Sequence, residues 1–403
     1  MRSERRMLCI VLCVALCLLS HSGTAVDLYM SGYGIDETEH SANVARFSDI
    51  LKGYNTIGAS IVLFKNGQII DVYNYGLSNR ADKIPVTNDT LFHVASISKM
   101  VSAIGLLKLW EFGAFEMDGD ISDYFGFKVR NPRYKDTPIT ARQIMTHTAS
   151  LIDTGHYARA LKGSIVKLST AFTGSNASTD FSYFKPGTRY DYSNFGGGLL
   201  GSLMETFAST TADQWMHEMI YQPLGITASY FYPALPAGTV IARNYSIGTY
   251  GMTYDTMAST KYETENDYER HYTYSAGALS ISAIDLAKIM MLIAGDGSTN
   301  GVRILNSSTV AAMRIPQNFI GSVQTDTNHG LNLNIIEDSI VRGRTLYGHQ
   351  GKAYGAISAA YCDPVDQSGV VLVTNGCDDS TVNSIARIAR DIMREGWKIL
   401  DRY

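Results

Sequence analysis

The chain has 403 residues, of which 45% are hydrophobic and 18% are charged, and its formal net charge is -4 at pH 7. This length and apolar content indicate a globular protein with one large domain or two interleaved ones. Because the chain has no basic excess, we expect no nucleic-acid partner.

The first 25 residues have the composition of a secretory signal. Arginines are frequent in Met1–Arg6, residues 7–19 form an apolar run, and Gly23–Ala25 offers the small residues of a cleavage site. The apolar run is too short to span a bilayer comfortably. We therefore predict a cleaved signal over residues 1–25 and a secreted chain with no stable membrane span, with a retained anchor as the alternative. Sequons for glycosylation of such a secreted chain occur at Asn88, Asn176, Asn244 and Asn306.

Removal of the signal would leave Cys362 and Cys377 as the only cysteines. They flank an apparent hairpin, with Cys362 near its turn and Cys377 beyond the far end of the returning strand, so we do not expect a disulfide, although the sequence leaves one open. Two cysteines are too few for a zinc cluster, and no His-Glu-x-x-His motif is present.

The mature chain begins with signals for a helix and a hairpin. Apolar side chains recur at helical spacing in a segment that starts near Glu37. Two apolar runs, at residues 59–64 and 68–75, then flank Asn66–Gly67, and such a dipeptide between two such runs favours a tight hairpin.

The middle of the chain predicts mostly helices with long loops. A capped short helix is expected over residues 139–147 and another helix over 196–207. Residues 245–274 carry seven tyrosines in turn-rich sequence. We interpret this segment as an exposed loop, with a substrate-facing rim as the alternative.

The last third of the chain returns to strands. Residues 283–294 predict a helix, and strands are expected at residues 345–348, 355–362 and 370–375. A closing amphipathic helix is indicated by the spacing of Val382, Ile385, Ile388 and Ile392. Strands at both ends predict a sheet domain over residues 26–105 and 275–403, with a mostly helical domain inserted at 106–274.

Ser96 and Lys99 form the first motif that carries chemistry. They lie three residues apart at the predicted start of a helix, so they share one face with Cβ atoms roughly 5 to 6 Å apart. A serine hydroxyl becomes a nucleophile when a base takes its proton, and a desolvated lysine amine can do so. Helix N-termini also favour developing negative charge. We predict a nucleophile and its base, the alternative being a capping serine and a solvated lysine.

The second motif is Tyr192-Ser193-Asn194, which follows a Lys-Pro-Gly turn. Tyr192 could shuttle a proton between Ser96 and a leaving group, aided by the Lys99 ammonium. Asn194 could hold a substrate carbonyl and the lysine. The alternative is that Tyr192 is a core aromatic residue with a satisfied hydroxyl.

The third motif is His349-Gln350-Gly351-Lys352, expected on or beside a strand. Gly351 would allow close approach of a substrate, and His349 could donate to a carboxylate or carbonyl. The backbone N–H of Lys352 could complete an oxyanion hole with that of Ser96. A histidine in a turn is the alternative.

Together, Ser-x-x-Lys, Tyr-x-Asn and His-x-Gly resemble the serine β-lactamase and penicillin-binding-protein superfamily. They look like the branch that holds class C β-lactamases, D-alanyl-D-alanine carboxypeptidases, D-aminopeptidases and serine esterases. Further segments that look like the family are Thr90–Phe92, Ile139–Thr148, Lys185–Gly187, Gln222–Gly225 and Ser275–Leu279. The resemblance covers nearly the whole mature chain.

The resemblance implies an α/β fold of the α+β type, with an antiparallel sheet flanked by helices and the active site between the sheet domain and the helical insert. It implies a small-molecule or short-peptide substrate, and no metal or cofactor. The implied site residues are catalytic Ser96, Lys99 and Tyr192, and substrate-binding Asn194, His349, Gly351 and Lys352.

One departure from the family pattern narrows the expected activity. His349 replaces the usual lysine, so the carboxylate of a β-lactam would lose a fixed cation, although Lys352 is close by. We therefore expect a secreted D-amino-acid peptidase, carboxypeptidase or esterase. The alternatives are a β-lactamase, or a non-catalytic binding or assembly protein that retains the fold. The substrate and the oligomeric state stay open.

A competing motif is Gly-x-Gly-x-x-Gly at residues 196–201. No apolar strand precedes it, as a dinucleotide site requires. We interpret these glycines as a place of close helix packing.

Overall fold

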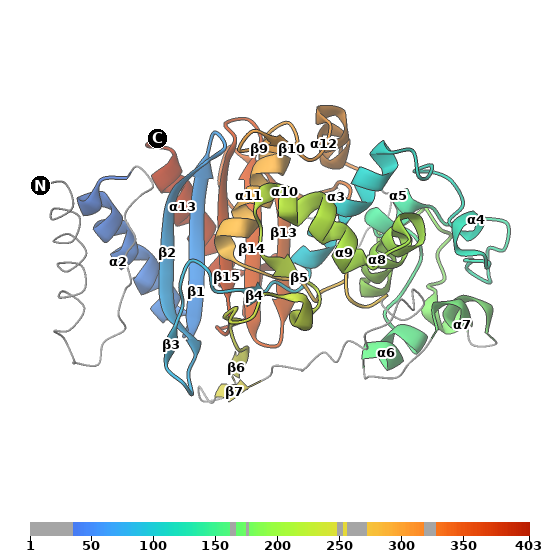
Figure 1. Ribbon diagram of the computed structural model, residues 1–403, viewed down its shortest axis with the longest axis horizontal. Coiled ribbons are helices and arrows are strands. Elements are labelled where there is room, and N and C mark those ends of the chain that lie inside the picture. The colour runs from blue at the N-terminus through green and yellow to red at the C-terminus, as the bar shows by residue number, and fades with distance from the viewer. Residues whose placement is uncertain (1–34, 162–166, 175–176, 248–252, 256–271, 318–327) are drawn as a thin grey trace, which may run out of the picture.

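The computed structural model describes residues 35–161, 167–174, 177–247, 253–255, 272–317 and 328–403. An eight-stranded sheet lies at the centre, with helices on both faces (Figure 1). Each neighbouring pair of strands in this sheet runs antiparallel, as expected. In sheet order the strands are β11 (Asn328–His329), β12 (Asn334–Glu337), β13 (Thr345–Ala353), β14 (Ala356–Asp363), β15 (Ser368–Thr374), β1 (Gly58–Lys65), β2 (Gln68–Asn79) and β3 (Ile84–Pro85).

The other described elements are α-helices, short strands, two 3₁₀ helices (Ala177–Asp180 and Tyr232–Ala234) and one π-helical turn (His217–Tyr221). The helices are α2 (Glu37–Gly53), α3 (Ile97–Glu111), α4 (Ser122–Phe125), α5 (Ala141–Met145), α6 (Gly155–Leu161), α7 (Leu168–Thr173), α8 (Asn194–Ala208), α9 (Ala212–Met216), α10 (Gln222–Leu224), α11 (Ala283–Ala294), α12 (Ser307–Arg314) and α13 (Arg387–Leu400). The short strands are β4 (Phe92–His93), β5 (Ala228–Ser229), β6 (Tyr245–Ile247), β7 (Thr253–Asp255), β8 (Ser280–Ile281), β9 (Ser298–Thr299), β10 (Val302–Arg303), β16 (Thr381–Val382) and β17 (Ile385–Ala386).

The two ends of the chain meet inside the large sheet. The β1–β2 hairpin turns at Asn66 and Gly67, which have φ values of 51° and 74°, the left-handed conformation that tight hairpins need. β1 then pairs with β15, with Ile61 opposite Leu372. The strands of the N-terminal hairpin therefore extend a sheet whose other members come from the last third of the chain.

The sheet is apolar on both faces because helices cover both. Ile61 and Leu63 of β1 belong to the cluster under α2 and α13, whereas Val62 and Phe64 belong to the cluster that includes α11. Figure 1 shows α2 and α13 on one side of the sheet and α11 on the other. A strand covered on both faces reads as a continuous apolar run, and β1 does.

One predicted element begins later than expected. Val382 and Ile385 lie in the short strands β16 and β17, and the closing helix α13 starts only at Arg387. The prediction that Val382 and Ile385 lie in the closing helix was therefore wrong. Ile388 and Ile392 are buried on α13, as expected. A turn at Asn383 and Ser384, both with positive φ, separates the two strands.

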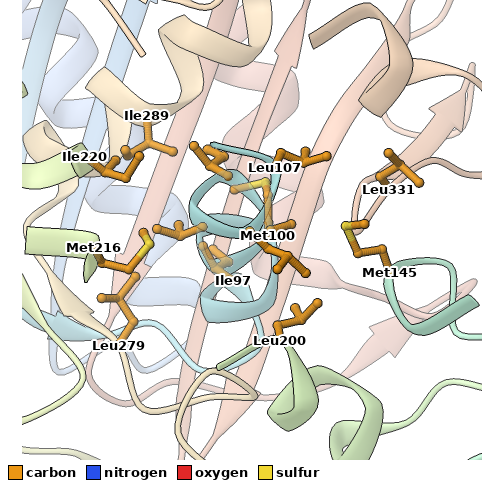
Figure 2. Packing of buried hydrophobic residues seen from close by; sticks show 14 of the residues in the cluster. Ile97, Met100, Leu107, Met145, Leu200, Met216, Ile220, Leu279, Ile289 and Leu331 are labelled. Atoms are coloured by element: carbon orange, nitrogen blue, oxygen red, sulfur yellow. The ribbon is translucent and has the colours of Figure 1, made fainter. Parts of the chain in front are cut away.

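Helix α3 is enclosed by other elements. Figure 2 shows it surrounded by side chains from several helices and strands. The labelled residues are Ile97, Met100 and Leu107 of α3, with Met145, Leu200, Met216, Ile220, Leu279, Ile289 and Leu331 around them. The helix runs from Ile97 to Glu111 and so crosses the predicted boundary at residues 105–106. At Gly105 it packs tightly, because a Cβ there would lie 2.2 Å from the sulfur of Met216. The predicted domain boundaries stay a prediction.

Gly197, Gly198 and Gly201 of α8 pack closely, as expected, whereas Gly196 does not. A Cβ on Gly198 would lie 1.4 Å from the carbonyl oxygen of Tyr272, and one on Gly197 would lie 2.5 Å from Cε of Lys99. α8 therefore lies against both the Tyr272 backbone and the side chain of Lys99 at distances that only glycine allows.

We expect Gly198→Ala to lower the free energy of unfolding by about 3 kcal/mol, because the obstructing atoms are backbone and cannot rotate away. Gly196→Ala is the matched control on the same helix, since its nearest neighbour would be 3.7 Å away. Alanine at this open site should stabilise the helix by up to about 1 kcal/mol. Urea denaturation of both variants measures the difference, and equal stabilities would contradict the packing argument.

Two predictions lie outside the described residues, wholly or in part. The signal sequence at residues 1–25 is one, and most of the tyrosine-rich segment at 245–274 is the other. Within the described part of the chain, no helix combines the length and apolarity needed to cross a membrane.

Candidate active site

Ser96 lies at a sharp turn that leads into α3. The preceding residue, Ala95, has a φ of 48°, which is unusual for a residue with a Cβ and is often found next to functional groups. Ser96 is half-buried and occupies the N-cap position, but its hydroxyl makes no capping hydrogen bond. The hydroxyl is therefore not committed to holding the helix.

Lys99 lies one turn later with no exposed surface. Its Nζ donates to three oxygens: Ser96 Oγ at 3.0 Å, Asn194 Oδ1 at 2.7 Å and the carbonyl of Ala276 at 2.6 Å. The structure thus brings the predicted nucleophile, the predicted base and Asn194 into one hydrogen-bonded group.

This arrangement suits an amine that exchanges a proton with Ser96. The Asn194 and Ala276 oxygens can only accept, so they fix two N–H bonds of Lys99 in either protonation state. The third position faces Ser96 Oγ, which can accept from the ammonium or donate to the neutral amine. The hydrogen-bonding pattern therefore allows the transfer without rearrangement of the site.

Asn194 is held in turn by a carboxylate that the sequence analysis missed. Asp153 Oδ2 accepts from Asn194 Nδ2 at 2.6 Å and from the Asn194 backbone N–H at 3.0 Å. Asp153 Oδ1 accepts from Ser193 Oγ at 3.0 Å and from the Phe195 backbone N–H at 2.9 Å. A lone aspartate in a loop, some 40 positions from its partner, gives no sequence signal.

His147 anchors the loop that carries Tyr192. Its carbonyl accepts from the Asp191 N–H at 2.8 Å, and its Nδ1 accepts from the Ser193 N–H at 3.2 Å. The His147 ring also lies 4.4 Å from the Tyr192 ring, between centroids. Burial and the nearby Lys99 hold the pKa of His147 well below its usual range, so the ring stays neutral.

Tyr192 lies beside the reactive pair. Nζ of Lys99 is 5.0 Å from the centre of its ring, and the centre of the His349 ring is 6.4 Å from the same point. The recorded contacts involve the ring and not the hydroxyl, so the proton relay through Tyr192 stays a prediction.

Strand β13 forms a wall next to Ser96. A Cβ on Gly351 would lie 2.2 Å from the Val94 carbonyl and 3.1 Å from Cβ of Ala95, so β13 touches the turn that holds the nucleophile. This close approach is the physical reason for glycine at position 351. Alternation along the strand places His349 on the same face as Gly351.

His349 is buried and neutral. Desolvation and the neighbouring Lys99 lower its pKa to about 3. Its Nδ1 lies 2.6 Å from the Gln350 carbonyl, which can only accept, so Nδ1 carries the proton and Nε2 has a free lone pair. The predicted donation to a substrate carboxylate would need a second proton on the ring, which burial opposes.

The Lys352 side chain turns away from the site. Its ammonium pairs with Asp379 at 2.7 Å, and it belongs to the strand face opposite His349. In this structure the ammonium is therefore engaged elsewhere, and a contact between the Lys352 side chain and substrate stays a prediction. The backbone N–H of Lys352 stays a predicted oxyanion donor.

We expect the protein to lose stability as the pH falls below about 6.5, by about 1.4 kcal/mol per pH unit for each of His147 and His349. Both have pKa values lowered from 6.5 by burial, so the unfolded chain binds more protons than the folded one in this range. Urea denaturation between about pH 7 and about pH 5 measures the slope. His349→Gln should reduce this slope by the contribution of one histidine, about 1.4 kcal/mol per pH unit. An unchanged slope would contradict the assignment of His349 as neutral in the folded protein.

Metal ligation and disulfide bonding depend on how the His, Cys, Asp and Glu side chains of the described residues are grouped. No group of three or more His, Cys, Asp or Glu side chains there could hold a metal ion. Cys362 and Cys377 are both buried and free, in agreement with the expectation from strand geometry.

Comparison with known proteins places the chain in a family. Residues 43–392 match the Beta-lactamase family. The chain is 25% identical over 353 residues to penicillin-binding protein 4 of Amycolatopsis lactamdurans, covering 84% of this chain and 86% of the relative. It is 23% identical over 360 residues to a putative D-alanyl-D-alanine carboxypeptidase of Escherichia coli K12, covering 80% of this chain and 79% of the relative.

A solved structure supports the same fold. The D-amino acid amidase of Ochrobactrum anthropi SV3, crystallised with L-phenylalanine amide, superposes with a TM-score of 0.70 at 19% identity, covering 91% of this chain and 99% of the amidase. The family match extends from α2 to α13 and includes all three motifs. The chain therefore belongs to the Beta-lactamase family, within the serine β-lactamase and penicillin-binding-protein superfamily, and is a serine hydrolase.

Proposed function

We propose that Ser96 attacks the carbonyl carbon of a small amide or ester and forms an acyl-enzyme that water then hydrolyses. The observation that supports this most directly is the 3.0 Å hydrogen bond between Ser96 Oγ and Lys99 Nζ, with Lys99 fixed by two further acceptors. A nucleophile in hydrogen-bond reach of an oriented base is the arrangement that covalent catalysis needs.

In the acylation step, Ser96 Oγ bonds to the carbonyl carbon and its proton passes to the neutral amine of Lys99. The carbonyl oxygen becomes an oxyanion, for which the Ser96 and Lys352 N–H groups are the proposed donors. Collapse breaks the bond to the leaving group, which receives a proton through Tyr192. Water repeats the sequence on the acyl-enzyme and restores Ser96.

We propose a neutral or amine-bearing acyl donor, either a D-amino-acid amide or peptide or a short-chain ester. The wall at His349 offers a neutral ring with an acceptor nitrogen, and the ammonium of Lys352 points elsewhere. Among the described residues, neither His349 nor Lys352 provides a fixed cation at this wall for a substrate carboxylate. This favours a D-amino-acid peptidase or an esterase over a carboxypeptidase or a β-lactamase.

Intact-mass spectrometry after incubation with a fluorophosphonate, followed by peptide mapping, tests the acyl-enzyme. An adduct on Ser96 supports the proposal. An unlabelled folded protein favours the non-catalytic alternative, and an adduct on another serine means that the nucleophile is wrongly assigned.

A substrate panel tests the acyl-donor class. Turnover of D-amino-acid amides or p-nitrophenyl esters should exceed that of matched substrates with a free carboxylate next to the scissile bond. Faster turnover of a cephalosporin than of both neutral classes would overturn the preference.

We also propose that the protein is secreted, because residues 1–25 have the composition of a cleavable signal. N-terminal sequencing of the mature protein should begin near Val26. An intact N-terminus in the membrane fraction would favour the retained anchor.

A further inference from the structure

Asp153 gathers hydrogen bonds from the residues that begin α8. Its two carboxylate oxygens accept four: two at Oδ1 and two at Oδ2, with donor–acceptor distances between 2.6 and 3.0 Å. Three of the donors are the Ser193 hydroxyl and the backbone N–H groups of Asn194 and Phe195. The fourth is the side-chain amide of Asn194, which is the contact that matters for Lys99.

The amide contact fixes which way Asn194 faces. The oxygen and nitrogen ends of an asparagine amide are nearly equal in size, so packing alone does not distinguish them. The carboxylate of Asp153 can bind only the NH₂ end, at 2.6 Å. Asn194 Oδ1 therefore faces Lys99 and accepts a hydrogen bond from its Nζ at 2.7 Å.

All four partners of Asp153 act as donors. The one ambiguous group is the Ser193 hydroxyl, but its oxygen accepts from the Gly196 N–H at 3.0 Å, so its proton points to Asp153. An asparagine at position 153 would turn an NH₂ group against two of these donors in either orientation. The position therefore requires a carboxylate, and not merely a side chain of its shape.

We propose that Asp153 is a positioning residue, which orients the Asn194 amide so that its oxygen holds Lys99 against Ser96. This inference rests on the proposed acyl-enzyme function of Ser96. Without the carboxylate, the Asn194 amide is free to present its NH₂ end to Lys99. Lys99 then loses one of the two acceptors that hold its Nζ near the Ser96 hydroxyl.

The test uses the rate at which a fluorophosphonate labels Ser96 in the full-length folded protein, together with the thermal midpoint of each variant. Asp153→Ala and Asp153→Asn should each slow labelling by ~10²-fold, since small misplacements of a reacting group cost about that much. Ser193→Ala is the control at the same helix end: it removes the cap to the Gly196 N–H and one of the four hydrogen bonds to Asp153, but it keeps the contact between Asp153 and the Asn194 amide. It should lower the thermal midpoint comparably and slow labelling far less.

A double-mutant cycle separates positioning from general structural support. If Asp153 acts through Asn194, the double variant Asp153→Ala/Asn194→Ala should label within about threefold of Asn194→Ala alone. Effects that multiply would mean that Asp153 acts independently of Asn194, and would overturn the inference.

The remaining outcomes separate this inference from the proposed function. If the folded wild-type protein is not labelled, both the acyl-enzyme at Ser96 and the positioning role of Asp153 are refuted. Labelling of Ser96 in the wild type, with Asp153→Ala labelled at the same rate, keeps the acyl-enzyme and removes only the role of Asp153. If Ser193→Ala slowed labelling as much as Asp153→Ala, general support of the N-terminus of α8 would explain the effect. The orientation of the Asn194 amide would not, and the inference would fail.

Discussion

We expect Ser96→Ala to fold normally and to lose at least ~10⁴-fold in turnover of any substrate that the wild-type protein hydrolyses. The hydroxyl makes no capping hydrogen bond, and its recorded partner is Lys99, so its removal leaves the helix start intact. The same removal takes away the only atom that the mechanism can acylate. Steady-state turnover and the thermal midpoint, measured on the same preparation, test both parts.

Ser102→Ala is a suitable comparison for this variant. Ser102 lies one turn after Lys99 on the same helix, and its hydroxyl bonds the buried Tyr230 hydroxyl at 2.6 Å and approaches the Ser275 carbonyl at 3.5 Å. Its loss should lower stability by about 1 kcal/mol and leave turnover in place. Turnover retained by Ser96→Ala would refute the proposed nucleophile, whatever the comparison shows.

The second large effect is expected for Lys99→Met, which keeps the length of the side chain and removes the amine. We expect turnover to fall by ~10³- to 10⁴-fold, the upper part of the range for general acid–base groups. The reason is that Ser96 would keep its hydroxyl but lose the base that lies 3.0 Å away. Fluorophosphonate labelling of Ser96 should be lost in parallel.

Lys108→Met, on the same helix, is the matched control. Lys108 pairs with Glu111 at 3.6 Å in a mostly buried contact, so its loss should lower stability but change the activity of the folded protein by less than ~2-fold. If Lys99→Met kept most of the activity while folded, another group would have to serve as the base, and the pair would be structural only.

Local features of the chain were readable from sequence because short-range physics sets them. Asn66–Gly67 can adopt the positive φ values that a tight hairpin needs, and the structure has both. The helix over residues 283–294 and the capped helix after Thr140 also follow from apolar spacing and a capping box. The late start of α13 shows the limit of this reasoning, since Val382 and Ile385 fit the helical spacing but lie in strands.

The chemistry-bearing motifs were also visible, since Ser96 and Lys99 are joined by one helical turn. That separation fixes their approach before any tertiary contact forms. The order of the three motifs identified the superfamily, and residues 43–392 match it. By itself, then, the sequence determined the local elements, the family and the reactive pair.

Only the tertiary structure decided which groups hold Ser96 and Lys99 in place and which charge state His349 has on the neighbouring strand β13. Asn194 and the Ala276 carbonyl come from segments far from Lys99 in the chain, and they contact it only after α3 and α8 pack together. Asp153 comes from a further segment and contacts Asn194. The neutral state of His349 likewise depends on its burial, which the motif does not encode. Periodicity and propensity describe neighbours within a turn or a strand, whereas hydrogen-bond direction and desolvation depend on which distant groups packing brings into contact.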